Sequence, residues 1–96
     1  MSSFQKHCEE SVHLFGEAYE EVHRWLDAYQ GTAECGFRHR CKRHHEAGIR
    51  ETAQLFGEKA AQVARQHIIT DLRQDGWTEG DPFPQDEAHY RTLPLL

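Results

Sequence analysis

The residues best suited to chemistry in this chain lie between Arg38 and Arg50, where the sequence reads RHRCKRHHEAGIR. Three of the eight histidines and one of the three cysteines fall within this stretch. Imidazole and thiolate bind borderline and soft metal ions, and imidazole also exchanges protons near neutral pH. Such a concentration indicates either a metal or catalytic site, or polar rings that are buried for structural reasons.

Helical periodicity separates the members of this stretch. We expect one long helix over about Thr32–Phe56, because its first residue suits an N-cap and Gly57 follows its last turn. On such a helix Cys41, His44 and His45 share the apolar, inward face, one turn apart. Gly48 lies further along that face and leaves room for a neighbouring helix or a ligand. His39 and the basic side chains Arg38, Arg40, Lys42 and Arg43 lie elsewhere, and we expect them to form a solvated surface.

A second pair of candidate ligands lies in the next predicted helix. His67 and Asp71 are four residues apart on the flank of an apolar stripe. This spacing suits two ligands of one metal, or a carboxylate that fixes the tautomer of a metal-bound imidazole. An earlier helix offers His23 at the edge of its own apolar stripe.

Together these residues predict a metal site in the interior of a helical bundle. The candidate ligands are His23, His44, His45, His67 and Asp71, with Cys41 nearby. Imidazole nitrogens with one carboxylate favour Zn²⁺ foremost, with Fe, Mn or Ni as alternatives. The competing interpretation is that carboxylates or backbone carbonyls satisfy the same histidines by hydrogen bonds, with no metal.

The sequence predicts that the helices carrying these residues form an all-α, single-domain bundle of about four helices. Besides the long helix, apolar spacing predicts helices over about Ser3–Phe15, Glu17–Tyr29 and Glu58–Arg73. An irregular tail follows Gly76, and a short fifth helix is predicted over about Gln85–Leu93, after Pro84. We treat residues 1–96 as one domain, with residues 1–76 as its helical core and residues 77–96 as a tail that packs on it.

Composition limits the classes of function. The chain has 96 residues and a net charge of −5, which argues against general nucleic-acid binding. No segment has the length and apolarity of a membrane span, and three cysteines without CxxC spacing favour a reducing, cytoplasmic setting. A homo-oligomer with an exposed helical interface is compatible with these properties.

Several blocks of the sequence resemble a family of small bacterial and phage proteins classed as a domain of unknown function. The blocks are HRWLD at residues 23–27, HR at 39–40, HH at 44–45, GI at 48–49, FG at 56–57 and QHIITDL at 66–72. The resemblance implies that His23, His39, His44, His45, His67 and Asp71 belong to a shared pattern, whereas Cys41 does not. It implies no activity.

Two functional hypotheses therefore remain. In the first, the protein is a small helical metal-binding domain, and a coordination position left open would make it hydrolytic. In the second, it is a non-enzymatic interaction or regulatory module, of phage origin or homo-oligomeric, whose histidines are structural. The sequence alone does not decide whether the protein is an enzyme.

Overall fold

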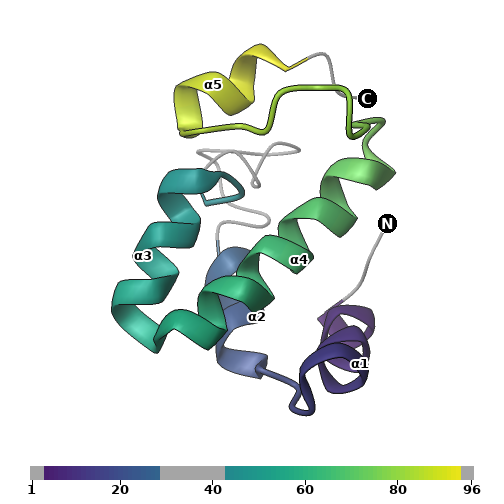
Figure 1. The fold of residues 1–96 in the computed structure, drawn as a ribbon, viewed down its shortest axis with the longest axis vertical. Helices are drawn as coiled ribbons and strands as arrows, with labels where there is room; N and C mark the ends of the chain where they lie inside the picture. The colour runs from purple at the N-terminus through teal and green to yellow at the C-terminus, as the bar shows by residue number, and fades with distance from the viewer. Residues whose placement is uncertain (1–3, 29–42, 94–96) are drawn as a thin grey trace.

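The structure is a computed structural model that describes residues 4–28 and 43–93. These two ranges contain five α-helices and no strand, which confirms the predicted all-α class. The helices are α1 (Phe4–Phe15), α2 (Glu20–Leu26), α3 (Glu46–Phe56), α4 (Glu58–Gln74) and α5 (Glu87–Thr92). In Figure 1, α4 runs through the middle of the molecule between α3 and α1. No helix in the described ranges is long and apolar enough to cross a bilayer.

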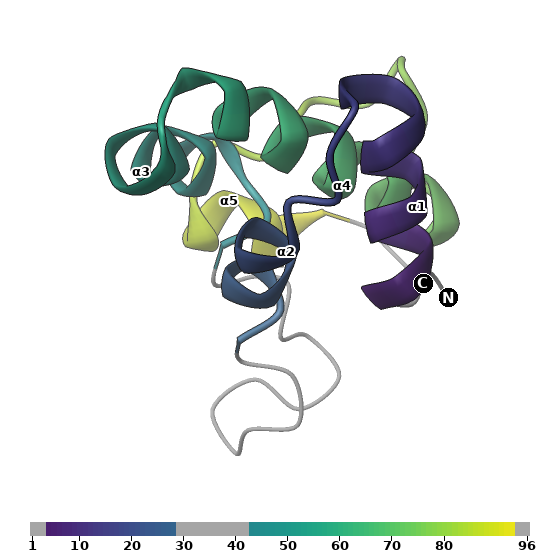
Figure 2. The same cartoon turned by 90° about the horizontal axis from the view of Figure 1, so that it is seen from below.

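The central helix α4 carries most of the core. Its buried stripe packs against α1, α2 and α3, and α3 makes the most extensive of these contacts. The buried residues of α4 are Ala60, Ala61, Val63, Ala64, His67, Ile68, Asp71 and Leu72. Figure 2 shows α2 between α1 and α3, with α1 beside α4. The small residues near the start of α4 let α3 approach closely, so that α3 and α4 form a helical hairpin around Gly57.

Helix α2 is shorter than the predicted Glu17–Tyr29. Tyr19 adopts a left-handed backbone conformation with φ of 53°, so the helix begins at Glu20. Helical hydrogen bonding ends at Asp27, whose N–H donates to the carbonyl of His23 at 3.2 Å. Asp27 therefore lies one turn after His23, at the C-terminal end of α2.

The prediction of one long helix over Thr32–Phe56 is confirmed for Glu46–Phe56, which form α3, and is wrong for residues 43–45, which precede it. His45 is extended, and its Nδ1 accepts a hydrogen bond from the Gly48 N–H at 3.0 Å. An imidazole therefore takes the N-cap role that a Ser or Asp side chain usually fills. His44 and His45 precede the helix, so the shared helical face inferred for them does not exist. The predicted positions from Thr32 to Lys42 lie outside the described residues.

Gly48 accounts for the sharp entry into α3. A Cβ built on Gly48 would lie 2.0 Å from the Arg43 carbonyl oxygen. The missing side chain at Gly48 therefore makes room for the backbone of Arg43, just before α3, rather than for another helix or a ligand. This close approach folds the turn back onto α3 and places His44 in the interior.

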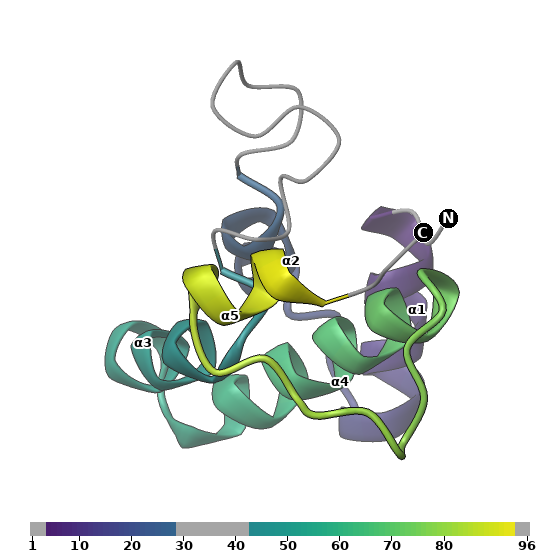
Figure 3. The ribbon, with the colours of Figure 1, turned by 90° about the horizontal axis from the view of Figure 1, so that it is seen from above.

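The C-terminal segment packs on the helices, as Figure 3 shows for α5 from above. The carbonyls of Pro84 and Gln85 accept hydrogen bonds from the N–H groups of Glu46 and Ala47, both at 2.9 Å. These bonds satisfy two of the backbone donors that begin α3. Trp77, Tyr90 and Leu93 are buried in the core.

Candidate metal centre

Four segments of the chain bring polar side chains to one buried position. Seven side chains meet there: His7 and Ser11 of α1, His23 and Asp27 at the two ends of one turn of α2, His44 before α3, and His67 and Asp71 of α4. The six residues from α1, α2 and α4 form three i,i+4 pairs, one for each helix, so each helix presents both of its members on one face. The side chains form two layers.

The inner layer, here called the four-ligand group, consists of Asp27, His44, His67 and Asp71. His44 Nε2 lies 3.0 Å from Asp71 Oδ2 and 3.5 Å from Asp27 Oδ1. His67 Nε2 lies 3.2 Å from Asp71 Oδ2 and 3.5 Å from Asp27 Oδ1. Ligands at about 2.0–2.1 Å from a tetrahedral Zn²⁺ are about 3.3–3.4 Å apart. The four distances scatter around that value, and one donor atom from each residue lies within 4.8 Å of the others.

The four-ligand group is nearly closed to solvent. The side chains of His44, His67 and Asp71 are 0–2% exposed, whereas that of Asp27 is 21% exposed. Two carboxylates and two neutral imidazoles carry a charge of −2, which complements a divalent cation. Nε2 of His67 makes no hydrogen bond, although it is buried near both carboxylates. A buried ring nitrogen in that state is costly unless something else binds it.

The carboxylates and imidazoles shift one another's pKa values. Burial alone would raise the pKa of Asp71, but the His44, His67 and His7 imidazoles around it outweigh burial and hold that pKa far below its usual range. Burial lowers the pKa of His44 to about 4, even though Asp71 opposes the shift. For His67, the nearby Asp27 and Asp71 overcome burial and raise the pKa. His44 is therefore neutral at pH 7 and has a lone pair to offer a metal.

The second layer, here called the outer layer, consists of His7, Ser11 and His23. His7 Nε2 lies 3.1 Å from Asp71 Oδ1, the oxygen that faces away from His44. His23 Nδ1 lies 2.8 Å from His67 Nδ1, and His23 Nε2 lies 2.7 Å from Ser11 Oγ. All three residues are at most 3% exposed. The outer layer thus contacts the two α4 members of the four-ligand group from the side of α1.

A comparison with family models now places the chain. A model described as a domain of unknown function, DUF6915, matches residues 1–78. The chain belongs to this family. No curated protein and no solved structure matches it. All seven residues of the two layers fall inside the matched part of this DUF6915 chain, whereas α5 lies beyond it.

The resemblance to a domain of unknown function is thereby confirmed, and the bacterial or phage origin stays a prediction. Among the five candidate ligands of this DUF6915 protein, His44, His67 and Asp71 meet in the four-ligand group. His23 lies in the outer layer, one hydrogen bond away from that group. His45 lies elsewhere, because its Nδ1 caps α3.

Three residues of the two layers are absent from the sequence-based ligand set: Asp27, His7 and Ser11. A signal for Asp27 was available, because His23 and Asp27 repeat the i,i+4 spacing of His67 and Asp71. His7 and Ser11 share this i,i+4 spacing, but they lie beside the apolar pattern of α1, and a serine is not a typical metal ligand. Their burial depends on how α1 packs against α2 and α4.

The remaining sequence candidates have other outcomes. His39 and Cys41 lie outside the described residues, as do Arg38, Arg40 and Lys42. Arg43 does not belong to a solvated surface as expected. Its guanidinium donates to the Trp25 carbonyl at 2.7 Å and lies 4.0 Å from the centre of the Trp25 ring. Arg43 thus fastens the turn that carries His44 to α2.

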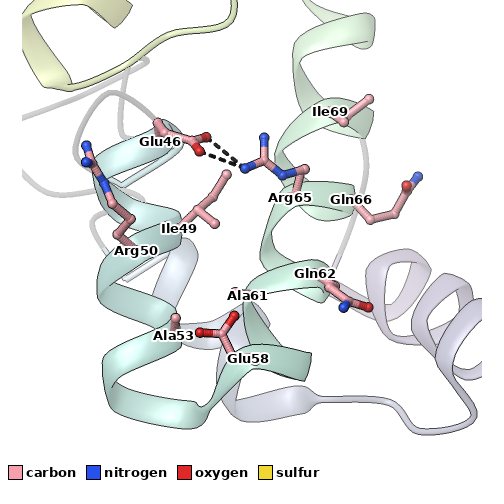
Figure 4. A pocket seen from close by; sticks show the side chains of 10 residues that line it. All are labelled: Glu46, Ile49, Arg50, Ala53, Glu58, Ala61, Gln62, Arg65, Gln66 and Ile69. Atoms are coloured by element: carbon pink, nitrogen blue, oxygen red, sulfur yellow. Dashed lines mark hydrogen bonds and ion pairs between the residues drawn. The ribbon is translucent and has the colours of Figure 1, made fainter.

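A surface hollow between α3 and α4 shares no residue with the four-ligand group. Figure 4 shows Arg65 reaching across it to Glu46, whose two carboxylate oxygens accept at 2.8 and 2.9 Å. Ile49, Ala53 and Ile69 contribute apolar surface to the hollow. Among the described residues, the groups of side chains spaced to hold a metal ion lie in the two buried layers.

Proposed function

We propose that this protein binds one transition-metal ion, Zn²⁺ foremost, through the four-ligand group. The observation that carries the proposal is the spacing of the donor atoms of Asp27, His44, His67 and Asp71, whose four measured separations are 3.0–3.5 Å. This spacing suits a tetrahedral shell of two nitrogens and two oxygens. The buried Nε2 of His67, which makes no hydrogen bond, supports the same assignment.

The geometry favours a closed, structural metal over a hydrolytic one. Four protein donors fill a tetrahedral shell, whereas catalytic zinc keeps one position for water or substrate. The metal would join α2, α4 and the turn before α3 through side chains from all three. The hydrolytic hypothesis requires that Asp27, the most exposed donor, yields its position to water.

Metal content is the decisive measurement. The untagged protein, freed of metal with a chelator and then reconstituted with Zn²⁺, is expected to retain one equivalent by ICP-MS. Asp27→Asn should lower Zn²⁺ affinity by at least about 10-fold in isothermal titration calorimetry. His13→Gln is the matched control, because His13 is exposed and belongs to neither layer. Less than about 0.1 equivalent in the wild-type protein would refute the proposal and favour the interaction module with structural histidines.

A thermal readout connects binding to the fold. Free Zn²⁺ at about 100 times its Kd stabilises a folded protein by about 2.7 kcal/mol. In a domain of this size, that corresponds to an increase in Tm of about 10–20 °C. An unchanged Tm at that Zn²⁺ concentration would show that the metal does not bind the folded protein in preference to the unfolded chain, and it would count against the proposal.

Cobalt separates the closed site from the hydrolytic one. Co²⁺ in a closed tetrahedral shell should absorb strongly in the visible range, and added azide should leave that spectrum unchanged. An azide-dependent spectrum would mean that a coordination position exchanges with solvent. That result would support the hydrolytic hypothesis and overturn the closed assignment.

A further inference from the structure

The two histidines of the outer layer, together with His67, have the composition of a second metal site, but their geometry opposes that role. His7, His23 and His67 each offer a ring nitrogen within 4.8 Å of the others. The His7 and His67 rings are stacked, with centroids 3.6 Å apart and an angle of 15° between their planes. A metal lies near the plane of each imidazole that binds it, because the lone pair lies in that plane. One ion cannot lie in two nearly parallel planes that are separated by a stacking distance.

The contact between His23 and His67 is a hydrogen bond rather than a shared coordination. Their Nδ1 atoms are 2.8 Å apart, which is shorter than the separation of about 3.3 Å expected for two ligands of one tetrahedral ion. The distance suits an N–H···N bond, in which one Nδ1 carries the proton and the other accepts it. The direction of this bond depends on what binds the other nitrogen of His67.

A metal on Nε2 of His67 fixes that direction. Nε2 must then present a lone pair, so the single proton of the neutral ring lies on Nδ1. The Nδ1–H of His67 donates to Nδ1 of His23, and the proton of His23 is consequently on Nε2. That N–H donates to Ser11 Oγ, which lies 2.7 Å away. This series of hydrogen bonds, from His67 through His23 to Ser11, is here called the relay. Each of its residues has one proton arrangement that agrees with the metal.

We propose that His23 and Ser11 are positioning residues for this metal site, and that they act by holding His67 in the Nδ1–H tautomer. His7 plays the corresponding part for Asp71, because its N–H holds Oδ1 and leaves Oδ2 toward the four-ligand group. This inference rests on the proposed function. It adds that α1, which supplies no ligand, completes the site through His7 and Ser11.

A hydroxyl is the appropriate end of the relay because it both donates and accepts. Without metal, a proton on His67 Nε2 would face Asp71 Oδ2, which lies 3.2 Å away. His67 Nδ1 would then accept from His23, and His23 Nε2 would accept from the Ser11 hydroxyl. Metal binding therefore reverses both hydrogen bonds, and the Ser11 hydroxyl rotates to satisfy His23 in either state.

Two variants of His23 test the positioning role. In His23→Asn, an amide oxygen takes the place of Nδ1 and can still accept the proton of His67. In His23→Leu, a side chain of similar reach has no acceptor. We expect His23→Leu to bind Zn²⁺ about 10–100-fold more weakly than the wild-type protein. His23→Asn should recover most of that loss, and equal affinities of the two variants would overturn the inference.

The tautomers can also be read in the wild-type protein, which covers the case in which His23→Leu does not fold. Two-bond ¹H–¹⁵N spectra of the imidazoles should show His67 protonated at Nδ1 and His23 at Nε2 after Zn²⁺ is added. Protonation of His23 at Nδ1 in the loaded protein would refute the relay. A wild-type protein that binds no Zn²⁺ would instead refute the proposed function, so the two failures are distinguishable.

Discussion

Replacing Asp71 with Asn tests how much the buried charge contributes to the metal-free fold. The nearest imidazole nitrogens of His7, His44 and His67 lie 3.0–3.2 Å from its two oxygens. Asn is nearly isosteric, but it has no charge and presents a donor in place of one oxygen. Removing one partner from a buried ionic cluster typically costs about 3–5 kcal/mol. A domain of this size has about 5–15 kcal/mol of stability in total, so the loss is a large fraction.

The assay is urea denaturation of Asp71→Asn and the wild-type protein in EDTA at pH 7.5, followed by circular dichroism. We expect the free energy of unfolding to fall by about 3–5 kcal/mol and Tm to fall by at least 12 °C or so. Glu51→Gln is the control, because it also removes one negative charge but lies on the exposed side of α3, and it should change stability by less than about 0.5 kcal/mol. A loss below about 1 kcal/mol for Asp71→Asn would refute the reasoning, since the imidazoles would then not need the charge.

Three further predictions concern the same buried residues. The metal-free protein should lose stability as pH falls from 6.5 toward 4. His23 and His44 have folded pKa values of about 3 and about 4, below the 6.5 of the unfolded chain, so the unfolded state binds more protons in this pH range. The lowered pKa of His44 alone contributes up to about 3 kcal/mol of stability. The contribution of His67 to stability depends on pH in the opposite direction, because its pKa is raised and its contribution is lost as pH rises. Thermal melts that show the greatest stability at pH 4 would contradict the predicted loss at low pH. His7→Phe keeps the ring stacked on His67 but removes the donor to Asp71, and it should weaken Zn²⁺ binding about 10-fold in calorimetric titrations, with unchanged affinity as the contrary result. Gly48→Ala should displace the turn that carries His44, because the new Cβ would lie 2.0 Å from the Arg43 carbonyl oxygen. We expect the free energy of unfolding in denaturant titrations to fall by about 3 kcal/mol. Wild-type stability would show that the turn adapts.

Much of the fold could be predicted because it depends on local signals. The helical limits of α1, α4 and α5 follow from apolar spacing and from glycine or proline at their ends. The error at α3 also has a local cause. His45 reads as an ordinary helical residue, but its ring nitrogen caps the helix instead, and the Gly48 N–H binds it only because the chain turns back at Arg43.

The candidate site was predictable only in part, because its ligands come from separate segments. The i,i+4 spacing places His67 and Asp71 side by side, and any structure containing α4 preserves that pairing. Nothing local indicates that His23 contacts Nδ1 of His67 while Asp27, one turn later, lies near Nε2 of the same ring. That division depends on the angle at which α2 crosses α4.

By itself, then, the sequence determined that the chain is all-α, that His67 and Asp71 share a face of the central helix, and that His44 is a candidate ligand. Only the tertiary structure decided which atoms meet. Helical periodicity reports the side of a helix on which a residue lies, but donor atoms 3.0–3.5 Å apart require the packing of α2 and α4 with the turn before α3. The roles of His7 and Ser11 depend on how α1 packs, because His7 contacts Asp71 of α4 and Ser11 contacts His23 of α2.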